Sequence, residues 1–173
     1  PSTEMKPTLT VGMTYEHTFK VPLSKTVPAL YPESEDFLSM PEVFATGFLV
    51  GFLEWACIKA INPHLDSPQE QSVGTHINIS HEAATPAGLN VTAKVELTKI
   101  DGRRLTFKVE AHDGVDLISQ GTHERFVIDR EKFDASISSG LAIMANQKHL
   151  YLPERKQSRI VVPLPRYSNV GNI

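Results

Sequence analysis

The chain has 173 residues, of which 40% are hydrophobic and 21% are charged, a composition typical of one folded domain with its own core. Its formal net charge of −3 argues against a general nucleic-acid binder, which needs a basic surface to displace counterions. The single cysteine, Cys57, excludes an intrachain disulfide and a multi-cysteine metal site. Since no signal-peptide pattern and no bilayer-spanning apolar run is present, we expect a cytoplasmic protein without membrane or nucleic-acid partners.

The first half of the chain predicts a strand followed by one long helix. Residues 8–21 alternate loosely between apolar and polar side chains, as in a strand. Residues 22–37 form a connection rich in Pro, Ser and Glu. Residues 39–42, Ser-Met-Pro-Glu, fit a capping box, with Ser at the N-cap and Glu three residues later. We therefore expect a helix from this box to Ile61, where Asn-Pro ends it.

Four further segments show the two-residue alternation of half-buried strands, at about residues 73–83, 90–100, 104–112 and 116–129. Short links with turn residues separate them, namely Pro-Ala-Gly and two Asp-Gly pairs. Such hairpins predict an antiparallel meander. The expected fold class is α+β, with a long central helix wrapped by an antiparallel sheet of about five strands.

The end of the chain differs from the rest. Residues 135–173 carry three prolines and a group of basic residues among apolar stretches. We expect a domain of residues 1–134, followed by a C-terminal extension of unknown role at residues 135–173. This extension either wraps the domain or a neighbouring chain, or forms a loosely ordered tail.

Glu54 is the most informative residue of the predicted helix. Side chains of residues 43–61 are apolar nearly all the way round, which indicates burial on most sides. Lys59 lies near the helix end and can extend its charge to solvent, whereas Glu54 must be paired, hydrogen-bonded or facing a cavity. Such a carboxylate suits a general base or a nucleophile. A solvated carboxylate or a structural ion pair is the alternative.

Thr46 and His81 are the other candidate catalytic residues. Thr46 lies eight residues before Glu54, about 12 Å along a straight helix, so the two reach one substrate only if the helix begins near Gly47 or if a second chain contributes. The alternative for Thr46 is a hydrogen bond to the preceding turn. His81 follows Ile77 and Ile79 at strand spacing, so it should point inward, where it can meet Glu54 and activate water. A hydrogen-bonded core histidine is the alternative.

Other reactive residue types show no such pattern. The remaining histidines have no zinc-ligand spacing, and we expect His112 and His123, each followed by a carboxylate, in solvated turns. Cys57 has apolar neighbours and is expected to be an unreactive thiol. We therefore expect no metal and no cofactor.

Several short strings resemble the fluoroacetyl-CoA thioesterase family, in register over about residues 11–133. They are residues 30–34, 41–48, 54–57, 74–76, 111–116 and 121–125, the last reading Gly-Thr-His-Glu-Arg. The resemblance implies a hot-dog fold, a homodimer, and hydrolysis of a short acyl-CoA to the carboxylic acid and free CoA. Fluoroacetyl-CoA, the substrate that gives the family its name, is one candidate for that acyl-CoA.

The resemblance also implies roles for individual residues. Three match the family's catalytic residues, namely Thr46, Glu54 and His81. The Gly74 N–H matches a donor that helps to hold the thioester carbonyl, and Arg125 matches an arginine lining the same pocket. Residues 31–40, which include Phe37, match a lid over the acyl group. Met40 stands where the fluoroacetyl-specific member has a phenylalanine gate, and a flexible thioether closes a pocket differently from a ring.

Two other functions remain open from the sequence. A non-catalytic acyl-CoA-binding or sensing hot-dog module would bind the same ligand without turnover. A hydratase-type hot-dog enzyme is a third option, although no Asp/His dyad stands at the expected kind of site. The sequence also leaves open whether Glu54 is the nucleophile or the general base.

Overall fold

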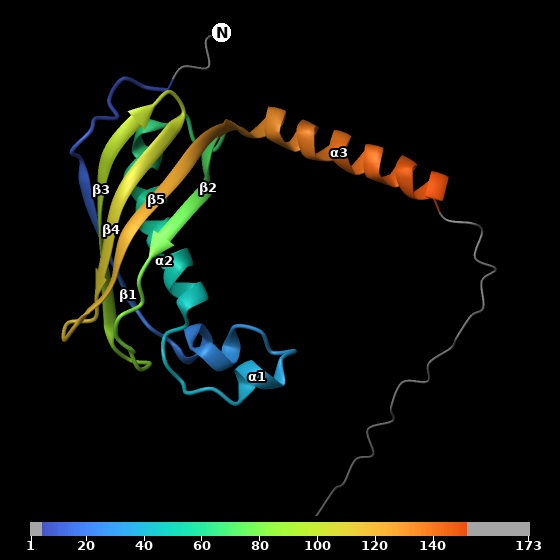
Figure 1. Cartoon of the computed structure of the whole chain (residues 1–173). Helices are drawn as coiled ribbons and strands as arrows, with labels where there is room; N and C mark the ends of the chain where they lie inside the picture. The colour runs from blue at the N-terminus through green and yellow to red at the C-terminus, as the bar shows by residue number, and fades with distance from the viewer. Residues whose placement is uncertain (1–4, 152–173) are drawn as a thin grey trace, which may run out of the picture. The chain divides into compact units, whose positions relative to one another are not determined.

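The fold is built on one helix and a curled antiparallel sheet (Figure 1). The computed structural model describes residues 5–151, and their side chains as far as residue 141. The helix α2, Thr46–Ile61, lies inside the curl of a five-stranded sheet with the order β1-β3-β4-β5-β2. The strands are β1 (Thr14–Lys20), β2 (Glu70–Ile79), β3 (Asn90–Asp101), β4 (Arg104–His112) and β5 (Leu117–Asp129). The predicted α+β class is confirmed.

Strict alternation gives β3 and β4 one buried face each. Every second side chain is buried, namely Val91, Ala93, Val95 and Leu97 in β3 and Leu105, Phe107, Val109 and Ala111 in β4. Val95 and Val109 are partners across the ladder, so the two apolar rows form one surface for the core. The bounds of β3, β4 and β5 agree with the prediction within one residue. By contrast, β1 starts six residues later than predicted, and β2 starts three residues earlier and ends four residues earlier.

The helix α2 buries one face against this sheet. Its buried residues recur at helical spacing and are Leu49, Phe52, Leu53, Ala56, Cys57, Ala60 and Ile61. Burial of each leucine side chain contributes about 1.5–3 kcal/mol to the free energy of folding. The prediction of burial nearly all the way round is wrong for the single chain, because Gly47, Gly51 and Trp55 form an exposed stripe. Trp55 is 43% exposed.

The chain enters α2 at Thr46, several residues after the start that the capping box at residues 39–42 predicts. The preceding residues are extended, because the Phe44 N–H donates to the Thr85 carbonyl at 2.7 Å. Ala45 is the N-cap and makes no side-chain capping bond. The predicted capping box is therefore wrong.

Residues of that box instead close a shorter helix, α1, Glu35–Leu38. Ser34 caps the start of α1 by accepting a hydrogen bond from the Phe37 N–H at 3.4 Å. At the other end, the Ser39 N–H donates to the Glu35 carbonyl at 3.2 Å. Two short 3-10 turns precede α1, Leu23–Lys25 and Val27–Ala29.

A third helix, α3, Arg130–Tyr151, follows β5 directly. Asp129 caps its start, because the Lys132 N–H donates to Asp129 Oδ1 at 3.1 Å. Residues 135–151 thus belong to α3. The sequence predicted no helix there, only a tail or a wrapping segment. Residues 152–173 lie outside the described part of the chain.

The chain divides into two compact units, residues 1–135 and residues 136–173. All the expected site residues lie in the first unit. Within residues 5–151, no helix combines the length and the apolar character needed to cross a membrane.

Candidate active site

Thr46 and His81 meet at the start of α2. Thr46 Oγ1 lies 2.7 Å from His81 Nδ1, so the hydroxyl and the ring share a hydrogen bond. His81 follows the end of β2 by two residues and faces the helix, in agreement with the alternation from Ile77 and Ile79. Burial lowers the pKa of His81, and its contact with the Ala83 backbone opposes this shift in part. The ring is therefore neutral at pH 7 and able to accept a proton.

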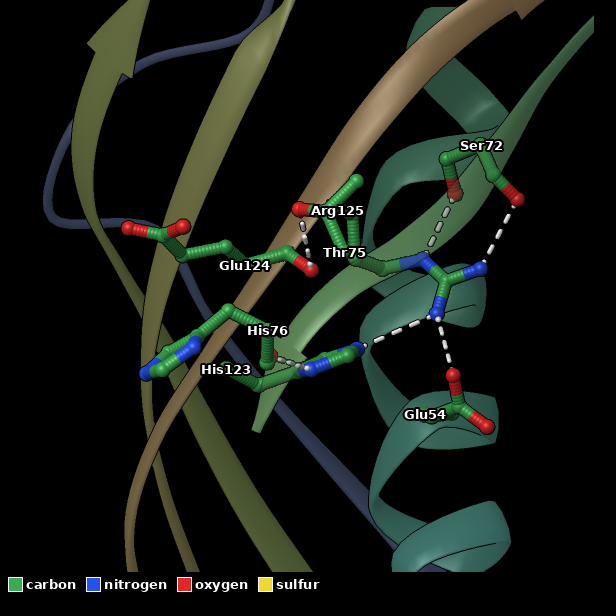
Figure 2. Close-up of polar contacts among 7 residues, drawn as sticks. All are labelled: Glu54, Ser72, Thr75, His76, His123, Glu124 and Arg125. Carbon is green, nitrogen blue, oxygen red and sulfur yellow. Dashed lines mark hydrogen bonds and ion pairs between the residues drawn. The ribbon is translucent and has the colours of Figure 1, made fainter. Parts of the chain in front are cut away.

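Glu54, in the middle of α2, pairs with a buried arginine of β5 (Figure 2). Arg125 Nη1 donates to Glu54 Oε1 at 3.3 Å, and the Arg125 side chain is only 3% exposed. Two further bonds of 2.8 Å fix the guanidinium, from Nε to Ser72 Oγ and from Nη2 to the Ser72 carbonyl. A buried cation needs such partners, because an unpaired charge in the interior is costly.

His123 lies beside this pair and is almost fully buried, with 1% of its surface exposed. Its Nε2 lies 3.1 Å from Arg125 Nη1, and its Nδ1 lies 2.7 Å from the His76 carbonyl oxygen (Figure 2). The prediction of a solvated turn is wrong for His123, because the residue lies within β5 and points into the core. For His112, at the end of β4, the half-exposed side chain agrees with the prediction.

Gly74 brings the backbone of β2 against the Glu54 carboxylate. A Cβ atom at this position would overlap Glu54 Oε1 and lie 3.3 Å from His123 Cε1, so only glycine leaves the carboxylate its place. The register between β2 and β5 shifts between Gly74 and His76, where Thr75 is the extra residue of a bulge. Bulges are common beside active sites, where they redirect the backbone.

The expected contact between Glu54 and His81 is not present within one chain. The Glu54 side chain is 36% exposed and bonds to Arg125, and no hydrogen bond joins it to His81 among the described residues. Its burial is thus less complete than expected. Thr46 and Glu54 remain apart on one helix, as their spacing predicts, so the candidate residues form two groups along α2.

The predicted lid lies at the Thr46 end of α2 (Figure 1). Phe37 in α1 stacks on Tyr31 with ring centroids 5.6 Å apart. Leu30 packs on the first turn of α2, with its Cδ1 3.1 Å from where a Cβ at Gly47 would lie. Met40 is 51% exposed. Phe37 and Met40 therefore belong to a segment beside Thr46 rather than beside Glu54.

Two residues around the Glu54–Arg125 pair, His123 and Ser72, were not predicted as functional candidates. Alternation along β5 carries a signal for His123, because His123, Arg125 and Val127 share one buried face. Nothing in the sequence marks Ser72. Burial raises the pKa of the Cys57 thiol to about 12, in agreement with an unreactive cysteine. Among the residues with described side chains, no group of three His, Cys, Asp or Glu is placed to hold a metal.

Comparison with known proteins gives close relatives over most of the chain. Residues 29–131 match the family of fluoroacetyl-CoA-specific thioesterases. A fluoroacetyl-CoA thioesterase from Streptantibioticus cattleyicolor is 56% identical over 133 residues, which are 77% of this chain and 95% of that protein. A solved structure of the fluoroacetyl-CoA thioesterase FlK is 55% identical, with a TM-score of 0.74 over 76% of this chain and 96% of that one.

A more distant structure agrees on the fold. A hot-dog-like protein from Thermanaerovibrio acidaminovorans is 21% identical, with a TM-score of 0.64 over 78% of this chain and 92% of that one. The sheet that curls around α2 is therefore a hot-dog fold, as the resemblance implied. From the match over residues 29–131 and the 56% identity, the chain belongs to the fluoroacetyl-CoA-specific thioesterase family.

Proposed function

We propose that this chain hydrolyses the thioester of a short acyl-CoA, with fluoroacetyl-CoA as the first substrate to test. The observation that carries the proposal is the Glu54 carboxylate, half-exposed and held by the buried Arg125 against the backbone of Gly74. The relative that is 56% identical is a fluoroacetyl-CoA thioesterase, which supports the same reaction class. Because acyl-CoA is an intracellular metabolite, we place the activity in the cytoplasm.

Glu54 supplies the nucleophile in this proposal, either by attacking the carbonyl carbon itself or by deprotonating a water molecule. In the net reaction water gives its hydroxyl group to the acyl carbon and a proton to the CoA sulfur, while the carbon–sulfur bond breaks. Neutral His81 carries that proton. The Thr46 hydroxyl and the Gly74 N–H stabilise the oxyanion, and such a donor is worth on the order of 10²–10³ in rate.

We propose that the active unit is a homodimer. β2 is an edge strand of the sheet, and its outer edge pairs with no strand of the described residues. The exposed stripe of α2, which includes Trp55, is a second uncovered surface. A second copy on these surfaces would bring its Thr46–His81 pair toward the Glu54 of the first. This arrangement would join the two groups that one chain keeps apart.

The decisive measurement is release of free CoA thiol from fluoroacetyl-, acetyl- and longer acyl-CoA substrates. We expect Glu54→Gln and His81→Ala each to lower kcat by about 10²-fold or more. Near-normal turnover in both variants would refute the assignment. Substrate binding without any thiol release by the wild-type chain would instead identify a non-catalytic acyl-CoA-binding module.

We further propose that Met40 weakens discrimination between fluoroacetyl-CoA and acetyl-CoA. A thioether side chain, 51% exposed here, adapts its shape and closes a pocket less rigidly than an aromatic ring. Met40→Phe should raise the ratio of kcat/KM for fluoroacetyl-CoA over acetyl-CoA, because a rigid gate responds more to the acyl group beneath it. Met40→Leu is the matched control, since it keeps a flexible apolar chain. An unchanged ratio in Met40→Phe would contradict this role.

A further inference from the structure

His123 is a buried titratable residue to which the proposed reaction gives no step. Its ring lies between β2 and the Arg125 guanidinium, with Nδ1 toward the His76 carbonyl and Nε2 toward Arg125 Nη1 (Figure 2). A guanidinium has only hydrogen-bond donors, so Nε2 must accept and cannot carry a proton. The ring proton is therefore on Nδ1, which donates to the His76 carbonyl. Both bonds require the neutral Nδ1–H form.

The Ser72 bonds of the Arg125 guanidinium leave one of its nitrogens to other partners. They hold one edge, through Nε and Nη2, and do not reach Nη1. Nη1 lies off that edge and bonds to both Glu54 Oε1 and His123 Nε2. Since the Glu54 carboxylate is half-exposed and His123 is almost fully buried, the neutral imidazole is the buried partner of Nη1.

We propose that His123 is a positioning residue, which as a neutral Nδ1–H imidazole aims Arg125 at Glu54 and ties Arg125 to the β2 backbone beside Gly74. The inference rests on the proposed function, in which Glu54 is catalytic. It adds a residue that touches no reacting atom and acts through Arg125. The same ring also contacts the bulge of β2. Its Nδ1 bonds to the carbonyl of His76, the residue that directly follows the extra residue Thr75.

Protonation of His123 would break this arrangement. An imidazolium would turn an N–H toward the N–H of Arg125 Nη1, where no acceptor is left. The groups that face the ring are Arg125 from β5, Glu54 from α2 and His76 from β2. Burial, the Arg125 charge and His76 lower the pKa of His123, whereas the His76 carbonyl and Glu54 raise it, and the net pKa lies below its ordinary value. The neutral form therefore persists at neutral pH and is lost only in acid.

Two substitutions separate the two bonds of the ring. His123→Gln places an amide oxygen at the reach of Nε2 and keeps an acceptor for Arg125, whereas His123→Asn keeps a donor near Nδ1 and removes that acceptor. We expect His123→Asn to lower kcat by about 10–100-fold with little change in KM, and His123→Gln to retain most of the wild-type kcat. His112→Asn and His112→Gln, at a half-exposed histidine outside the site, are the matched controls.

A second measurement needs no variant and no turnover. Nitrogen-15 NMR of the histidine rings in the wild-type chain should show His123 as the neutral Nδ1–H form at pH 7. An Nε2–H form or an imidazolium would overturn the proposal, and so would equal loss of kcat in folded His123→Asn and His123→Gln. Absence of wild-type turnover would refute the proposed function instead, and the ring signal would still report the positioning of Arg125.

Discussion

Two residues set the position of the Glu54 carboxylate, and both lie at its Oε1 atom. Arg125 attracts it with a buried positive charge, and Gly74 leaves it room against β2. Glu54 stands out in the sequence as an acid in an apolar helix, but its partner does not. The pair joins positions 71 residues apart, one in α2 and one in β5, which meet only in the folded chain. The inward face of β5 also buries His123, so the local pattern His-Glu could not reveal its surroundings.

Substitution of Gly74 tests the steric half of this arrangement. In Gly74→Ala the new Cβ overlaps Glu54 Oε1, so the carboxylate must move away from the β2 backbone. We expect kcat for acyl-CoA hydrolysis to fall by about 10–100-fold, since small displacements of a reacting group are costly. Gly140→Ala is the control, because a Cβ at Gly140 has no neighbour within 4 Å. Unchanged kcat in a folded Gly74→Ala chain would contradict the prediction.

At the scale of elements, the predictability of each segment follows the range of the contacts that define it. β3 and β4 are predicted nearly residue for residue, because side-chain alternation within a strand records which face is buried. The start of α2 is not, because the bond from the Phe44 N–H to the Thr85 carbonyl joins distant parts of the chain and outweighs a local capping signal. For α3, Asp129 is a capping residue that the sequence contains. The helix was not predicted because the prolines near the end of the chain favoured an extended or loosely ordered segment.

The turn between β4 and β5 depends on one buried carboxylate, Asp113, which is 6% exposed. Asp113 Oδ1 accepts from the Val115 and Asp116 N–H groups at 3.0 and 2.8 Å, and Oδ2 accepts from the Thr85 hydroxyl at 2.9 Å. Burial alone would raise the pKa of Asp113, but these bonds outweigh it and lower the pKa. Asp113→Ala should therefore cost about 1–3 kcal/mol in the free energy of unfolding at pH 7.

The sign of the pH dependence follows from that lowered pKa. The stabilisation from Asp113 is complete above the pKa of the unfolded chain and is lost as the pH falls through the lower folded-state pKa. The difference in unfolding free energy between wild type and Asp113→Ala should thus shrink below about pH 4. Denaturant unfolding at several pH values measures it, with Asp116→Asn as the exposed control. Equal stability of Asp113→Ala and wild type at pH 7 would contradict this account.

At the scale of the whole molecule, the chain divides into two units, and all the candidate site residues lie in the first, residues 1–135. The relative from Streptantibioticus cattleyicolor matches 77% of this chain with 95% of its own length, so part of this chain lies outside the match. We propose that the first unit dimerises and acts without it, since every candidate site residue and the free edge of β2 lie there.

Deletion of residues 136–173 tests this division. We expect the shortened chain to keep the mass of a dimer by light scattering, and to keep its kcat and a Tm within about 3 °C of the full chain. The physical reason is that the core residues of the hot-dog unit all precede the cut. The full-length chain is the reference in each measurement. A monomeric full-length chain, or a shortened chain that no longer folds, would contradict the prediction.

The buried thiol of Cys57 has a practical consequence for all the rate measurements. Its side chain is inaccessible and its pKa is about 12, so almost no thiolate exists at the pH of an assay. Aromatic disulfide reagents that report free sulfhydryl groups will therefore register the coenzyme A that is set free and give no background from the native protein. Because the Cys57 thiol does not react, a single cysteine introduced at the surface can be labelled selectively with a fluorophore or a spin label, and Cys57 need not be replaced.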